Sequence, residues 1–171
     1  MNSTLPLIAS LMILVSCGES TSSSTELPSD DSAVAAATNN IDLAQHDMPL
    51  LVNVPETGTP AMAVMNEEMG RMEVRAGEHF GIIITEMAPD FARLKADLER
   101  DMLLKNSIVE ETPELLLYRS EYPDGAGTIM HFMQVVKSGA RTFVVEDLPD
   151  GRFNESDAKA MVDAVRTKPT S

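Results

Sequence analysis

The sequence has 171 residues, a formal net charge of −14 and a pI of about 4.4. A chain of this length forms one domain with tails, and its 43% hydrophobic content is enough for a packed core. A protein that binds duplex nucleic acid needs a basic face to meet the phosphates, so the acidic balance excludes a nucleic-acid partner. The 12 methionines are scattered along the chain, which indicates core packing and not a copper site.

The chain starts with an apolar run from Leu5 to Val15, and the first charged side chain is that of Glu19. The run is about half of the ~20 residues that a helix needs to span a bilayer. It has the length of the apolar region of a signal peptide, although the only positive charge before it is the terminal amine. We therefore predict a signal peptide over residues 1–16.

The end of this run forms the string Leu14, Val15, Ser16 and Cys17, in which a small serine precedes the only cysteine of the chain. The string resembles the lipobox of bacterial lipoproteins. The resemblance implies a diacylglyceryl thioether on Cys17, cleavage before that residue and acylation of the new amino terminus, as with palmitate. Two or more acyl chains anchor a protein stably, at ~0.8 kcal/mol per buried methylene. No other thiol is left for a disulfide or a cysteine metal site.

The same resemblance predicts where the protein resides. The residue after the cysteine is Gly18, whereas an aspartate there would retain a lipoprotein at the inner membrane under the familiar sorting rule. We expect a protein of the cell envelope whose partner is the membrane, through the lipid on Cys17, with an envelope protein as a further partner. The outer membrane is favoured over the inner one, and both the periplasm and the cell surface stay open as the side that the domain faces.

A polar segment follows the cysteine, so that residues 17–40 form a lipidated cysteine and a tether. Gly18 to Asn40 is rich in Ser and Thr, and it carries acids but no bases. Such a composition cannot bury enough surface to offset the entropy of ordering, which predicts a disordered spacer with a span of roughly 25 Å. Its acids lack the spacing of a calcium loop.

From residue 41 onward the pattern changes, and residues 41–171 are predicted to form one globular domain. Strands are predicted at Leu50–Val54, Ala61–Met65, Met72–Val74 and His79–Glu86. Met72–Val74 alternates with charged residues and has one wet face, whereas His79–Glu86 is apolar on both faces, as in an interior strand.

A helix is predicted after these strands. Asp90 can cap the free amides of its first turn, and Asn106 suits its exit. One apolar stripe along this helix is formed by Phe91, Leu94, Leu98 and Met102.

Four more strands are predicted at Ser107–Glu111, Leu115–Glu121, Thr128–Val136 and Arg141–Asp147. Asp-Gly and Ser-Gly turns separate the later ones, which favours antiparallel hairpins. A last helix is predicted from Asn154, which has capping-box spacing with Asp157. Its apolar stripe is formed by Ala158, Met161, Val162 and Val165. The predicted fold class is α+β, with a single antiparallel β-sheet and both helices packed on it.

Several short strings suggest a family. The strand Phe80–Ile84, the helix that contains Lys95 and the strand Met130–Phe132 follow one another in an order that resembles uncharacterised bacterial lipoproteins. The arrangement is similar to the PsbP-like α/β/α sandwich over about Met48 to Thr167. This resemblance implies a non-enzymatic accessory or binding protein, and it transfers no site residues.

The residues that could carry chemistry do not form known motifs. His46, His79 and His131 lack the spacing of a zinc site, so the fold would have to bring them to ligands, and metal binding by a histidine stays open. The acids near Glu110 to Glu114 are expected at a wet strand end, not as a hydrolytic pair. No nucleophile elbow or phosphate loop is present. We therefore predict no catalytic residues, no metal and no cofactor.

One small ligand patch is a candidate. His131 is expected to be a partly buried, hydrogen-bonded strand histidine, and Tyr118, Arg119 and Arg141 could join it at the surface. The predicted function is that of a membrane-anchored envelope module with a non-catalytic binding or accessory role. The alternative is an envelope hydrolase or another metal-dependent enzyme.

Overall fold

The computed structural model describes residues 40–123 and 125–169. The predicted leader, the lipobox and Cys17 lie outside the described residues. Within the described part of the chain, no helix is long and apolar enough to cross a membrane.

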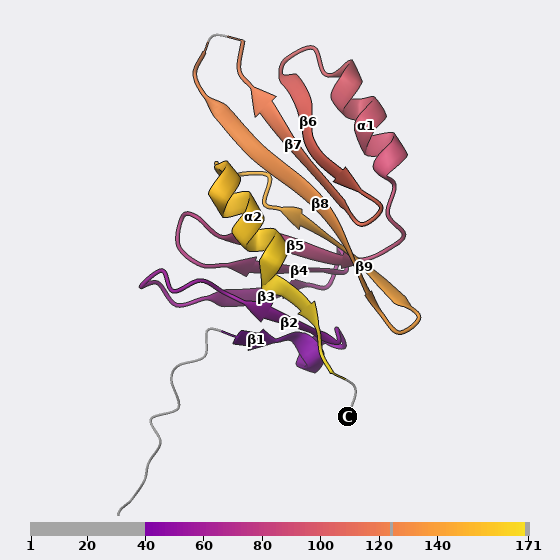
Figure 1. The fold of residues 1–171 in the computed structure, drawn as a ribbon. Coiled ribbons are helices and arrows are strands. Elements are labelled where there is room, and N and C mark those ends of the chain that lie inside the picture. The colour runs from indigo at the N-terminus through magenta and orange to yellow at the C-terminus, as the bar shows by residue number, and fades with distance from the viewer. Residues whose placement is uncertain (1–39, 124, 170–171) are drawn as a thin grey trace, which may run out of the picture. The chain divides into compact units, whose positions relative to one another are not determined.

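Most of the described chain forms a seven-stranded antiparallel sheet with the order β3-β4-β5-β9-β8-β7-β6 (Figure 1). The strands confirm the predicted ones to within a few residues. Their bounds are β3 Met62–Asn66, β4 Arg71–Arg75, β5 Gly81–Glu86, β6 Lys105–Thr112, β7 Leu115–Glu121, β8 Thr128–Ser138 and β9 Arg141–Asp147. Successive strands pair as hairpins except at one point, because the chain leaves β5 in the middle of the sheet and resumes with β6 at its far edge.

The prediction of a single sheet was wrong, because a second antiparallel sheet is present. It consists of β1 (Asn40–Asp42), β2 (Leu50–Asn53) and β10 (Val165–Thr167), with β2 in the middle. A short 3-10 helix, η1 (Leu43–His46), joins β1 to β2. A strand of three residues contains too little alternation to be recognised from sequence.

Two helices lie in the connections between strands of the described chain. They are α1 (Phe91–Arg100) and α2 (Glu155–Ala164). Both predicted caps are confirmed: the Asp90 carboxylate accepts from the Arg93 N–H at 2.9 Å, and Asn154 and Asp157 form the reciprocal capping box. Val165, which was predicted on the stripe of α2, instead begins β10 opposite Val52.

The end of α1 differs from the prediction. The helix ends at Arg100, so Met102 lies beyond it with 97% of its surface exposed and takes no part in an apolar stripe. Asn106 lies in β6, not at the helix exit. Its side-chain amide nevertheless donates to the Leu98 carbonyl at 3.0 Å, and so satisfies one of the free carbonyls of the last turn.

Different elements pack on the two faces of the seven-stranded sheet. Ile82 and Ile84 of β5 lie on the face that forms the main core, together with buried residues of β2 and Met161 of α2. On the other face α1 lies beside β6, where Lys95 pairs with Glu111 at 2.7 Å (Figure 1). None of the residues of α1 is fully buried, so α2 contributes far more to the core than α1 does.

Replacement of Asn154 by alanine is expected to lower the free energy of unfolding by about 1 kcal/mol, because the Asp157 N–H loses its capping acceptor. Urea unfolding of the purified full chain measures this loss. Ser156→Ala, an exposed change in the same helical turn, is the control and is expected to have little effect. Equal stability of the two variants would contradict the capping role.

Candidate functional site

The structure brings together two of the four residues of the predicted patch. Tyr118 of β7 lies directly opposite His131 of β8, and their rings stack with centroids 5.2 Å apart. Arg119 follows Tyr118 in the strand and therefore faces the other side of the sheet. Arg141 lies at the start of β9, where its guanidinium pairs with Glu86 at 2.6 Å. The four side chains thus occupy three different places.

His131 is partly buried and hydrogen-bonded, as predicted. Its Nδ1 lies 2.7 Å from Oδ2 of Asp147, and the two side chains are 18% and 5% exposed. The other oxygen of Asp147 accepts from the Phe132 N–H at 2.9 Å. Both oxygens of this carboxylate therefore bind β8 and hold the end of β9 against it. The His131–Asp147 pair thus stabilises the sheet.

Burial near the His131–Asp147 pair changes the pKa of two neighbouring groups. Burial raises the pKa of Tyr118, and the charges of Asp147 and Glu146 raise it further. Burial also raises the pKa of Glu146, with a smaller contribution from the Asp147 charge. Glu146 lies opposite Ile83 on one side and Met133 on the other, so apolar neighbours oppose its ionisation.

The raised pKa of Glu146 makes the stability of the fold depend on pH. The penalty is absent below the pKa of the unfolded state, where the carboxyl is protonated in both states, and it grows as the pH rises toward the higher folded pKa. Glu146→Gln removes this penalty. Its free energy of unfolding relative to the wild type is therefore expected to rise as the pH increases above the usual pKa of a glutamate.

Urea unfolding at several pH values measures this difference for the Glu146 variant. Glu99→Gln, at an exposed position on α1, is the matched control and is expected to show no such trend. A difference between Glu146→Gln and wild type that stays constant over the range would show that Glu146 ionises freely in the folded protein.

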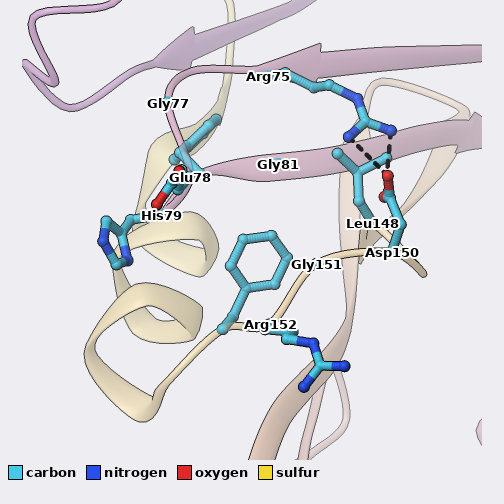
Figure 2. Close-up of a pocket in the computed structure, with 11 residues that line it drawn as sticks. Arg75, Gly77, Glu78, His79, Gly81, Leu148, Asp150, Gly151 and Arg152 are labelled. Carbon is cyan, nitrogen blue, oxygen red and sulfur yellow. Dashed lines mark hydrogen bonds and ion pairs between the residues drawn. The ribbon is translucent and has the colours of Figure 1, made fainter.

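A hollow of about 380 Å³ lies between the β4–β5 turn and the connection from β9 to α2 (Figure 2). Two glycines allow these segments to pack closely. A Cβ on Gly81 would overlap a Leu148 methyl group, and one on Gly151 would overlap the Phe153 ring. A larger residue at either position would therefore force Leu148 or Phe153 to shift, so glycine suits the close packing of these walls.

Charged side chains surround this hollow. Arg75 donates two hydrogen bonds to Asp150, at 3.2 and 3.3 Å, and this contact lowers the pKa of Asp150. Nδ1 of His79 lies 3.2 Å from the Asp157 carboxylate that caps α2. The rim of the hollow is therefore polar. Its ion pairs connect β4 and the β4–β5 turn with the segment that leads into α2 and with the start of α2.

Sequence reasoning did not single out this hollow. It gave no role to Asp150 or to Arg75. These two residues are 75 positions apart in the chain, and no motif relates them. Only the pairing of β5 with β9 brings their segments together.

Apart from His79, the candidates named from the sequence do not line this hollow. Glu111 pairs with Lys95, and Glu114 pairs with Lys137 at 3.0 Å. His46 is the last residue of η1. Within residues 40–123 and 125–169, no three His, Cys, Asp or Glu side chains are grouped so that they could hold a metal ion. The described lining of the hollow contains no Ser, Thr, Cys or Lys that could act as a nucleophile.

Comparison with known proteins adds no relative. No family model, no curated protein and no solved structure matches the chain. The function of the chain is therefore inferred from its own residues and from the chemistry that they allow.

Proposed function

We propose that the chain is a lipid-anchored module of the bacterial envelope that binds a ligand or partner without catalysing a reaction. The observation that carries the proposal is the position of the only cysteine, directly after an apolar run and Leu14, Val15 and Ser16. Lipid attachment needs a cysteine at this place, and chance would rarely put the only one there. The Ser- and Thr-rich segment that follows supports the same function as a tether.

The charge of the chain fits a domain that is held away from the lipid surface. The whole chain carries a formal net charge of −14, and an anionic membrane repels such a chain. The anchor would then supply the attachment, and the tether would supply the reach. Gly18 supports the outer membrane as the location within this proposal.

The hollow between the β4–β5 turn and α2 is the binding site within this proposal. Its volume of about 380 Å³ lies at the small end of the range for ligand sites, roughly 300–1,000 Å³. Its walls are held by backbone hydrogen bonds: the Phe80 carbonyl accepts from the Ala76 N–H at 2.9 Å, and the Phe153 carbonyl accepts from the Met130 N–H at 2.8 Å. A site with fixed walls loses little entropy when a ligand binds.

Replacement of Cys17 by serine is expected to abolish labelling of the protein by an alkyne analogue of palmitate, because the acylated amino terminus forms only after processing at the cysteine. The label is followed by gel fluorescence in bacteria that express the full chain. Ser20→Ala, three residues further on, is the matched control and is expected to keep the label. Mass spectrometry that found an intact Met1 and a free Cys17 thiol in the wild type would contradict the proposal.

One observation favours a hydrolytic function as the second candidate. His79 lines the hollow, and its contact with Asp157 could orient the imidazole as a general base for a water molecule. The first proposal predicts that wild type and His79→Gln hydrolyse nitrophenyl esters and fluorogenic peptides at the same background rate. A wild-type rate at least about tenfold higher, lost in His79→Gln, would support the hydrolase instead.

A further inference from the structure

Two charged side chains at the hollow lack partners, in contrast to their neighbours. Glu78 and Arg152 line the hollow, both are exposed, and neither forms an ion pair or side-chain hydrogen bond with the residues described by the structure. The other charges there are paired, Arg75 with Asp150 and His79 with Asp157. One anion and one cation are thus left to interact with a ligand.

The two free charges come from different walls. Glu78 lies in the β4–β5 turn, and Arg152 lies in the connection from β9 to α2. Figure 2 shows the two side chains on opposite sides of the hollow. A ligand that meets both must therefore carry its own opposite charges at two separated ends.

Core side chains form the back of the hollow between the two charges. Phe80, Leu148 and Phe153 line the hollow and are almost completely buried in the core behind it. Leu148 and Phe153 pack closely against Gly81 and Gly151, which fixes the position of this floor. Because these side chains are already almost fully removed from water, the floor gives a ligand a shape to fit, and the two charges supply the recognition.

We infer that the hollow binds a short peptide of two or three residues with free termini. The peptide carboxylate meets the guanidinium of Arg152, which suits a bidentate contact, and the peptide ammonium meets the carboxylate of Glu78. A ligand with only a negative charge would be repelled by the carboxylate of Glu78. A ligand with only a positive charge would be repelled by the guanidinium of Arg152. Each residue of an extended peptide adds about 3.3–3.6 Å, so two or three residues separate the termini far more than a single amino acid does.

This inference names the ligand class of the binding module proposed above, and it does not depend on the lipid anchor. The test uses the purified full chain in detergent and isothermal titration calorimetry at low salt. The probe is the tripeptide Ala-Leu-Ala. Its N-acetyl form keeps only the negative end, its C-terminal amide keeps only the positive end, and free leucine tests the length.

The tripeptide with free termini is expected to bind at least about tenfold more tightly than either blocked form, since each loses one charge-assisted contact. Free leucine is expected to bind more weakly than the tripeptide. If the N-acetyl form or the amide bound as well as the free tripeptide, the hollow would be a simple anion or cation site and the inference would be overturned. Absence of binding by all four probes would overturn it as well.

Two variants test which side chain binds which terminus of the peptide. Glu78→Gln is expected to weaken the free tripeptide about tenfold and to leave the N-acetyl form unchanged, because that form has no ammonium group. Arg152→Gln is expected to weaken the free tripeptide and to leave the amide unchanged. Glu68→Gln and Arg100→Gln, at exposed positions away from the hollow, are the controls and should bind like the wild type.

The peptide-binding test and the lipid-labelling test can fail independently of each other. Since neither Glu78 nor Arg152 contacts the rest of the described fold through its charge, both variants are expected to keep the melting temperature of the wild type. Tripeptide binding that survived both variants would overturn the inferred site. Loss of the palmitate label without loss of tripeptide binding would contradict the anchor alone.

Discussion

The pairing of β5 with β9 is the constraint on which the rest of the structure depends. It places Ile82 opposite Asp147 and Ile84 opposite Val145, across more than a third of the chain. The hairpins before β5 and those from β6 to β9 would otherwise be two separate small sheets, and neither could bury its apolar face alone. Joined in this way, they form one sheet whose central strands β5 and β9 contribute fully buried residues to the core.

The same pairing also builds the hollow. The Leu148 N–H donates to the Gly81 carbonyl at 3.1 Å, which extends the β5–β9 contact past the end of the strand. The chain then continues through Asp150 and Gly151 into α2, directly beside the β4–β5 turn (Figure 2). Core and candidate site therefore have one origin, and a change that loosened β9 would affect both.

Charge is distributed unevenly around this framework. The buried carboxylate of Asp147 uses both oxygens, one with His131 and one with the Phe132 amide, as a charge in the interior must. At the hollow, Arg75 and Asp150 satisfy each other, whereas Glu78 and Arg152 remain in water. The first arrangement stabilises the fold, and the second leaves charges available for recognition, which agrees with a binding module at the end of a tether.

The sequence alone determined the features that depend on neighbouring residues. Alternation marked the strands from β2 to β9, and Asp90 and Asn154 marked the starts of both helices, because strand faces and helix caps are set within a few residues. It also placed the single cysteine behind an apolar run. Lipid attachment at Cys17 remains a prediction, since that residue lies outside the described chain.

Only the tertiary structure decided which distant segments meet. It added β10 to β2, because a three-residue strand becomes stable only when its partner is already in place. It ended α1 before Met102, where no core was available to bury the side chain. It separated Arg119 and Arg141 from the Tyr118–His131 stack, and it brought the turn of Glu78 beside Arg152. Such contacts come from sheet order and register, which no local pattern of residues specifies.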